Sequence, residues 1–114
     1  MTYTVVNKDE LPHSGSAYRF EGHRHGGAHV SFFISDTAPG KGLGPHTHPY
    51  DEVFILQEGE LTFTVGNATV EAKSGQVVVA PASAPHKFFN SGTGPARRVD
   101  IHTGGRMSTE WLDD

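Results

Sequence analysis

Four residues of this chain have the types and the spacing of a metal-ligand set. His46 and His48 are separated by one residue, so on an extended segment both imidazoles project from the same face. Glu52 follows His48 by four residues, an even spacing that keeps its carboxylate on the inward face of a regular strand. His86 opens the segment HKFFN and would have to come from a neighbouring strand. Three imidazoles and one carboxylate would bind a divalent cation through nitrogen and oxygen.

The composition excludes several other kinds of site and partner. The 114 residues contain no cysteine, which rules out disulfides, thiolate metal sites and cysteine nucleophiles. The formal net charge is −4 and Lys and Arg do not cluster, which argues against a nucleic-acid partner. No apolar run reaches the ~18 residues of a membrane helix. Because no basic segment followed by an apolar stretch opens the chain, we expect no secretory signal and a cytoplasmic location.

Short strands must position these ligands, because no segment shows the apolar period of a helix. The segments in question are rich in β-branched and aromatic residues and are bounded by Gly, Pro, Asn or Ser. We expect one all-β domain over residues 1–114, a sandwich or a barrel, with Gly66 and Asn67 as a tight hairpin turn. The predicted strands are 30–35, 52–57, 60–66, 68–72, 76–81, 86–90 and 97–102.

Two further segments are predicted to lie outside this set of strands. The Gly- and His-rich stretch 21–29 is expected to be a loop that enters the strand at Val30. At the C-terminal end, Ser108 or Thr109 could cap a short helical turn through TEWLDD.

The ligand residues resemble the two sequence motifs of the cupin superfamily. The resemblance implies an antiparallel double-stranded β-helix, or jelly-roll barrel, with a metal near its centre, as in small single-domain cupins that are commonly dimeric. One residue departs from the pattern: Ser83 stands where the second motif has Gly, a residue that takes a positive φ more readily. The residues that match are Gly40, His46, His48, Glu52 and Gly59 in the first motif and Gly75, Pro81, His86 and Asn90 in the second.

A nitrogen and oxygen ligand set of this kind suits several divalent metals. Mn, Fe, Co, Ni, Cu and Zn all accept it, and the sequence does not rank them. Four protein ligands on a six-coordinate ion leave two positions for water, dioxygen or a substrate, and such exchangeable positions are typical of catalytic sites. A small organic substrate with one chelating polar end would fit an apolar pocket beside the metal. The pocket residues that we predict are Phe54, Leu56, Phe63 and Phe88.

Three classes of function fit these residues. The first is a metalloenzyme acting on a small organic substrate by dioxygenase, isomerase, decarboxylase or lyase chemistry. The second is a ligand-binding or sensory module, in which the metal only anchors a small molecule. The third is a structural barrel without a metal. The likeness to cupins implies a homodimer, and Val53 and Ile55, which point opposite to Phe54, favour one. Packing of that sheet against N-terminal strands explains these residues equally well.

The remaining histidines support less specific predictions. Asp100 and His102 share one face of their strand. If that face is inward, they could be acid–base groups, with His102 contacting the substrate; we expect instead an outward, ordinary surface placement. Three other histidines, His23, His25 and His29, could form a surface metal site. We expect them to be solvated loop residues, because a Gly-rich segment does not pre-organise ligands.

Overall fold

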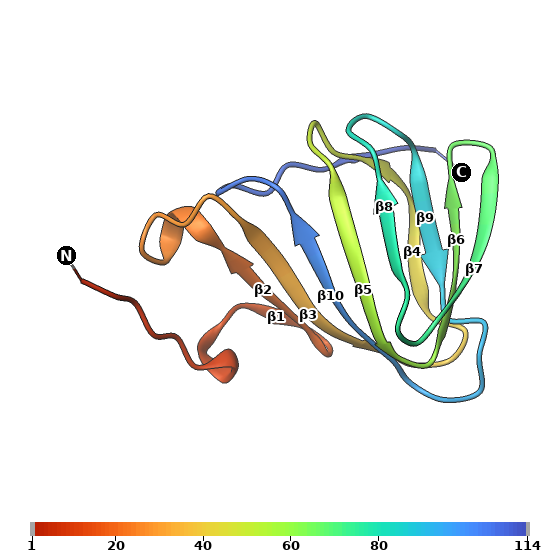
Figure 1. Ribbon diagram of the computed structural model, residues 1–114, viewed down its shortest axis with the longest axis horizontal. Helices are drawn as coiled ribbons and strands as arrows, with labels where there is room; N and C mark the ends of the chain where they lie inside the picture. The colour runs from red at the N-terminus through yellow and green to blue at the C-terminus, as the bar shows by residue number, and fades with distance from the viewer. Residues whose placement is uncertain (1, 114) are drawn as a thin grey trace.

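The computed structural model describes residues 2–113, which contain eleven strands and two 3-10 turns joined by loops (Figure 1). All seven predicted strands are present, with ends that differ from the prediction by no more than two residues. The strands are β1 (His13–Ser14), β2 (Ala17–Glu21), β3 (Ser31–Thr37), β4 (Gly42–Thr47), β5 (Glu52–Glu58), β6 (Glu60–Val65), β7 (Ala68–Lys73), β8 (Val77–Ala80), β9 (His86–Phe89), β10 (Ala96–His102) and β11 (Glu110–Trp111), and the turns are η1 (Lys8–Glu10) and η2 (Gly22–Arg24).

The strands form two antiparallel sheets, in the double-stranded β-helix arrangement of a cupin. One sheet has the order β1-β2-β3-β10-β5-β8 and the other has the order β11-β4-β9-β6-β7. From β3 onward the chain changes sheet at almost every connection, since β3 and β5 lie in one sheet and β4 lies in the other. This winding brings segments far apart in the sequence side by side (Figure 1). It is how residues of β4, β5 and β9 come to share the barrel interior.

The core lies between the inner faces of the two sheets. On β5, Phe54 and Leu56 point inward and are buried, whereas Val53 and Ile55 point to the outer face and are half-buried. On β6, the predicted alternation is also present, with Leu61 and Phe63 fully buried. Burying one such side chain stabilises the fold by roughly 1.5–3 kcal/mol. These residues therefore form the apolar part of the barrel interior.

Two turns lie where the sequence predicts a change of chain direction, and one of them has a positive φ at a serine. The predicted hairpin turn at Gly66 and Asn67 joins β6 and β7. Before the second motif's histidine, Ser83 adopts a positive φ of 66°, so serine takes the left-handed conformation that the cupin motif assigns to glycine. The backbone N–H of Ser83 donates a hydrogen bond to the carbonyl oxygen of His48, at 2.8 Å. This turn therefore holds the segment that carries one of the ligand histidines.

The structure corrects the prediction for the C-terminal segment. Residues Glu110–Trp111 form the short strand β11 and not a helical turn. They pair with the edge of β4, where Trp111 lies opposite His46. An exposed sheet edge offers unpaired backbone groups, and these outweigh the weak local preference for a helical cap. The predicted loop 21–29 contains the 3-10 turn η2.

The placement of β10 also differs from the prediction. Asp100 and His102 face the barrel interior and are buried, whereas Val99 and Ile101 lie on the outer face. The alternation itself was predicted correctly, but the two faces were assigned the wrong way round. The reason is that β10 lies between β3 and β5, so its inward residues sit beside Phe54 and Glu52.

The described residues also contain no helix long and apolar enough to cross a membrane.

A glycine substitution at the turn between β5 and β6 tests how closely that turn approaches the start of β10. Gly59 has a φ of +87°, and an added Cβ would overlap the carbonyl oxygen of Pro95. Gly66 has a φ of +58° but has open space around it. We expect Gly66→Ala to lower the free energy of unfolding by about 1–2 kcal/mol from backbone strain alone. Gly59→Ala should cost about 1–3 kcal/mol more because of the overlap, as measured by urea denaturation. Equal losses in the two variants would contradict this account.

Candidate metal centre

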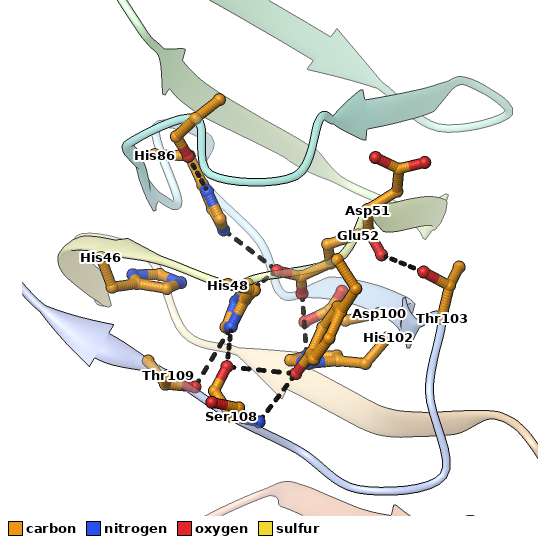
Figure 2. Close-up of polar contacts among 12 residues, drawn as sticks. His46, His48, Asp51, Glu52, His86, Asp100, His102, Thr103, Ser108 and Thr109 are labelled. Atoms are coloured by element: carbon orange, nitrogen blue, oxygen red, sulfur yellow. Dashed lines mark hydrogen bonds and ion pairs between the residues drawn. The ribbon is translucent and has the colours of Figure 1, made fainter.

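Four side chains from three strand regions converge inside the barrel. His46 lies on β4, His48 follows that strand directly, Glu52 begins β5 and His86 begins β9. One ligand atom from each residue can be chosen so that all four atoms lie within 4.8 Å of one another, and all four residues are buried. His46 and His86 are register partners on adjacent strands, with ring centroids 4.3 Å apart. Figure 2 shows the imidazoles of His48 and His86 directed at the Glu52 carboxylate.

Each of the three imidazoles is oriented by a backbone carbonyl group. A carbonyl oxygen only accepts hydrogen bonds, so the Nδ1 atom that contacts it must carry the proton. In a neutral ring the Nε2 atom then has a free lone pair, which points into the cluster. The pairs of Nδ1 atom and carbonyl oxygen are His46 with Gly44 at 2.7 Å, His48 with Ser108 at 2.8 Å and His86 with Ala84 at 3.0 Å.

The Glu52 carboxylate lies directly against these lone pairs. Its Oε1 atom is 2.9 Å from Nε2 of His48 and 3.0 Å from Nε2 of His86. Nε2 of His48 is buried and has no hydrogen-bond partner. An oxygen and two nitrogens that all present lone pairs repel one another unless a proton or a cation lies among them. The donor set and this unsatisfied nitrogen fit a divalent cation.

The pKa values of the cluster show the same electrostatic demand. Burial alone would raise the pKa of Glu52, but contacts with His102, His48 and His86 together hold it well below the usual range. Burial lowers the pKa of His46. For His86, burial acts in the same direction, but the contacts with Glu52 and the Ala84 carbonyl outweigh it and raise the pKa. The ionised form of Glu52 is therefore favoured when positive charge lies beside it, whether as a proton on a neighbouring imidazole or as a bound cation.

His102 approaches the same carboxylate from the opposite side. Its Nε2 atom is 3.2 Å from Oε2 of Glu52, and its Nδ1 atom is 2.6 Å from the hydroxyl oxygen of Tyr50. The backbone N–H of Ser108 donates to the Tyr50 oxygen at 3.0 Å. If the hydroxyl donates to Nδ1, the proton of His102 is on Nε2 and is donated to Glu52. In that tautomer, which is opposite to that of the three other histidines, His102 would position Glu52. The Tyr50 hydroxyl has one other acceptor, the Ser108 carbonyl oxygen at 3.3 Å.

A buried ion pair lies one step further along β10. Nε of Arg98 donates a hydrogen bond to Oδ2 of Asp100 at 3.0 Å and lies 2.9 Å from Oδ1, which receives no hydrogen bond. A second Arg98 nitrogen, Nη1, donates to the hydroxyl of Thr37 at 2.6 Å. Burial raises the pKa of Asp100 to about 7 against the opposing effect of Arg98. The interior of β10 therefore carries a row of polar residues toward the cluster.

The residues predicted to line a substrate pocket have different surroundings. Phe54, Leu56 and Phe63 belong to the buried hydrophobic core. Phe88 also belongs to the core and in addition lines a cavity between the two sheets. His102 contacts Glu52, as described above. The predicted apolar residues are thus brought together, but only Phe88 reaches the cavity.

The histidines of segment 21–29 take no part in the cluster. His23 lies 3.6 Å from the carboxylate of Glu21, and the ring of His25 stacks on Phe20. Within residues 2–113, the one group of His, Cys, Asp or Glu with metal-ligand spacing is the cluster of His46, His48, Glu52 and His86. The expectation that the other histidines are loop residues is consistent with these contacts.

Several residues at the site were not anticipated from the sequence. Tyr50 lies within the first motif, and its even spacing from His46 and His48 is the only signal that could have placed it on the same side. Arg98 shares the inward face of β10 with Asp100, so a correct assignment of that face would have found it. Ser108 and Trp111 give no local signal, because they reach the cluster only through the pairing of β11 with β4.

Comparison with known proteins identifies the family. Residues 33–102 match the cupin domain family Cupin_2, and the chain therefore belongs to it. Among curated proteins, it is 28% identical over 90 residues to protein SchB of Streptomyces halstedii, and 40% identical over 43 residues to an uncharacterized protein of Streptomyces coelicolor. The aligned parts are 71% and 38% of this chain. The chain spans only 64% and 41% of the length of these relatives.

Solved structures show the same fold. An uncharacterized double-stranded β-helix protein of Klebsiella pneumoniae has a TM-score of 0.74 and 21% identity, with 96% of this chain and 97% of that chain covered. Oxalate decarboxylase of Lactobacillus farciminis, in complex with formate, has a TM-score of 0.78 and 21% identity. The match covers 91% of this chain and 34% of the decarboxylase chain. A recombinant oxalate oxidase in complex with glycolate has a TM-score of 0.77 and 21% identity. The match covers 94% of this chain and 62% of the oxidase chain. At these identities the likeness establishes the fold alone.

Removal of the Tyr50 hydroxyl tests whether the contact through His102 orients Glu52. In Tyr50→Phe, Nδ1 of His102 loses its donor, so the tautomer that donates to Glu52 is no longer fixed. We expect the affinity for added Zn or Mn to fall by roughly tenfold, as measured by competition with a chromophoric chelator. Tyr18→Phe, on the outer face of β2, is the matched control and should leave the affinity unchanged. An unaltered dissociation constant in Tyr50→Phe would show that the hydroxyl does not act on the metal site.

Proposed function

We propose that this chain binds one divalent transition metal through His46, His48, Glu52 and His86 and acts as a metalloenzyme on a small organic substrate. One observation carries the metal assignment: Nε2 atoms of two buried imidazoles, whose Nδ1 atoms contact backbone carbonyl oxygens, lie about 3 Å from the Glu52 carboxylate, so neutral rings would present lone pairs to it. A cation relieves this repulsion, whereas burial makes it costly when nothing compensates it. The nitrogen and oxygen donors suit Mn, Fe, Co, Ni, Cu or Zn.

The proposed chemistry depends on positions of the ion that the protein does not fill. Four protein ligands on a six-coordinate metal leave two positions, where a bound metal would polarise a substrate oxygen or activate dioxygen. We propose that His102, which contacts Glu52, and Phe88, which lines the adjacent cavity, lie beside the substrate. Phe54, Leu56 and Phe63 would support the site from the core, since the Phe54 ring lies 6.0 Å from that of His86.

Metal content is the direct test of this proposal. Protein purified without added metal, or loaded and then desalted, should contain about one divalent ion per chain by elemental analysis. His86→Ala should lose the ion, whereas His29→Ala, at an exposed residue outside the cluster, should retain it. A chelator should lower the melting temperature of the wild type, because a ligand that binds only the folded state stabilises it by mass action.

The same experiment separates the classes of function. The proposed metal centre would be contradicted if the purified protein contained no metal and its melting temperature stayed the same with chelator and with added metal. Metal-loaded protein that takes up no oxygen and converts no enol, thiol or carboxylate substrate would contradict the enzyme and favour a small-molecule-binding module.

We also propose that the protein is a homodimer, formed through the outer face of the larger sheet. An antiparallel sheet usually has one polar, solvated face, but this sheet is apolar on its outer side as well as in the core. The register of five adjacent strands places ten apolar or aromatic residues in two rows across it. The rows are Phe20, Phe32, Ile101, Val53 and Val79, and Tyr18, Ile34, Val99, Ile55 and Val77.

The two ends of this face differ in how they are covered. At the β2–β3 end, Val6 and Leu11 of the N-terminal segment line a cavity together with Phe32. At the β8 end, Val77 and Val79 remain 57% and 54% exposed. Contiguous exposed apolar surface of this kind is typical of a protein interface, and a second copy presents the same face. The N-terminal segment therefore covers one part, and the partner copy would cover the other.

Charged substitutions on β8 test this interface. The double variant Val77→Lys/Val79→Lys should be monomeric in size-exclusion chromatography with light scattering, because burial of two ammonium groups opposes association. The monomer should stay folded, since both side chains are exposed in it. Val70→Lys, at a valine on the other sheet that is 40% exposed, is the control and should remain dimeric. A monomeric wild type would rule out the proposed dimer.

A further inference from the structure

A cavity of about 460 Å³ opens between the two sheets and is lined by residues outside the cluster. This volume lies in the range of about 300–1,000 Å³ that is usual for small-molecule sites. Its walls come from the inner faces of β2, β3 and β10 on one side and from β4, β9 and β11 on the other. Large apolar side chains dominate these walls, namely Phe33, Leu43, Phe88 and Trp111.

Two wall residues connect the cavity with the proposed metal centre. The ring of Trp111 lies 4.9 Å from that of His46, measured between centroids. Asp100 shares the inward face of β10 with His102, whose Nε2 atom lies 3.2 Å from Glu52. At the rim, Trp111 and Leu43 are 61% and 46% exposed. Exposed apolar residues around a hollow are typical of a ligand entrance.

The inner end of the cavity is polar and only partly satisfied. Asp100 is 4% exposed and its Oδ1 atom receives no hydrogen bond. Arg98 is fixed by its bonds to Asp100 and Thr37, and its guanidinium carbon lies 4.4 Å from the centre of the Phe88 ring. Oδ1 already lies 2.9 Å from Nε of Arg98, but a carboxylate oxygen has a second lone-pair site, which a ligand hydroxyl could use. The remaining hydrogen-bonding capacity at this end is therefore on Asp100.

The charges around the cavity indicate the kind of ligand that fits. The lining contains two acidic residues, Asp36 and Asp100, and two basic residues, Lys41 and Arg98, so its formal charges cancel. A neutral ligand is favoured, because a second carboxylate would face Asp100 and an ammonium group would face Arg98. A hydroxyl group suits Asp100 well, since it can donate to the carboxylate and accept from the protonated acid.

We propose that this cavity is the substrate site, and that it takes a neutral, mainly apolar and aromatic molecule whose hydroxyl group hydrogen-bonds to the carboxylate of Asp100. The inference rests on the proposed function, which it extends by naming a substrate class. The aromatic walls hold the body of the ligand, and the Arg98–Asp100 pair fixes its hydroxyl end. Trp111 lines the cavity and its ring lies 4.9 Å from that of His46, so the bound molecule would lie one side chain away from the proposed metal centre.

Three probes of matched shape test the chemistry on the full-length protein. These are 4-propylphenol, propylbenzene without the hydroxyl, and 4-propylbenzoate with a negative charge. Binding is measured by calorimetry and by the shift of the indole N–H signal in NMR, which reports on the cavity because Trp111 is the only tryptophan. We expect the phenol to bind at least about tenfold more tightly than propylbenzene, from one hydrogen bond to a charged group, and the benzoate to bind more weakly than the phenol.

Variants identify the group that recognises the hydroxyl. Arg98→Met/Asp100→Leu removes both members of the buried pair, which is better tolerated than the loss of one. This double variant should still bind propylbenzene, but its preference for the phenol should disappear. Asp36→Asn removes a carboxylate at the partly exposed rim of the same cavity and should keep the preference. The comparison of the three probes on the wild type does not depend on how well the double variant folds.

Each outcome decides between the two proposals. Equal binding of the phenol and propylbenzene by the wild type would overturn recognition of a hydroxyl group. Binding that leaves the indole signal unchanged, or absence of binding by protein that holds one metal ion per chain, would overturn the cavity as substrate site and leave the metal centre intact. Phenol binding at the cavity by protein that takes up no metal would instead overturn the metal centre and retain the ligand site.

Discussion

The contact between the Glu52 carboxylate and the surrounding imidazoles is the interaction on which the rest of the structure depends. Glu52 is buried, and its oxygens lie 2.9 to 3.2 Å from nitrogens of His48, His86 and His102. His102 can donate a proton to this carboxylate, but the other two nitrogens present lone pairs when their rings are neutral. The arrangement therefore requires positive charge at one point in the interior. A fold that places these groups together has to supply the hydrogen bonds that keep each ring in its orientation.

The two-sheet winding supplies those hydrogen bonds from separate parts of the chain. The carbonyl groups of Gly44 and Ala84 each orient a histidine two residues later in the chain. The carbonyl of Ser108, which orients His48, comes from the segment before β11. That segment also contacts the Tyr50 hydroxyl through its backbone N–H. The C-terminal segment is thus part of the site and not an appendage to the barrel.

The sequence was sufficient to predict which four side chains come together, but not their surroundings. The spacing of His46, His48 and Glu52 reflects the two-residue period of a strand, which is a local property, and the strand ends follow from turn residues such as Gly66. The inward direction of Asp100 and His102 depends on the neighbours of β10 in the sheet, which no local pattern specifies. The same holds for β11, whose conformation is set by the free edge of β4.

The polarity of β10 links the site to the outer surface of the barrel. Arg98, Asp100 and His102 occupy the inward positions of this strand, and Val99 and Ile101 the outward ones. Because successive side chains of a strand alternate between faces, polar groups inside leave the apolar positions outside. The neighbouring strand β5 is apolar on both faces from Val53 to Leu56, so the outer apolar rows run without interruption across β10. Because the polar face of β10 points inward and builds the site, its apolar face points outward. That outer face must be shielded from water by another part of the chain or by a partner. The proposed dimer and the proposed active site are therefore two consequences of one alternating segment, residues 97–102.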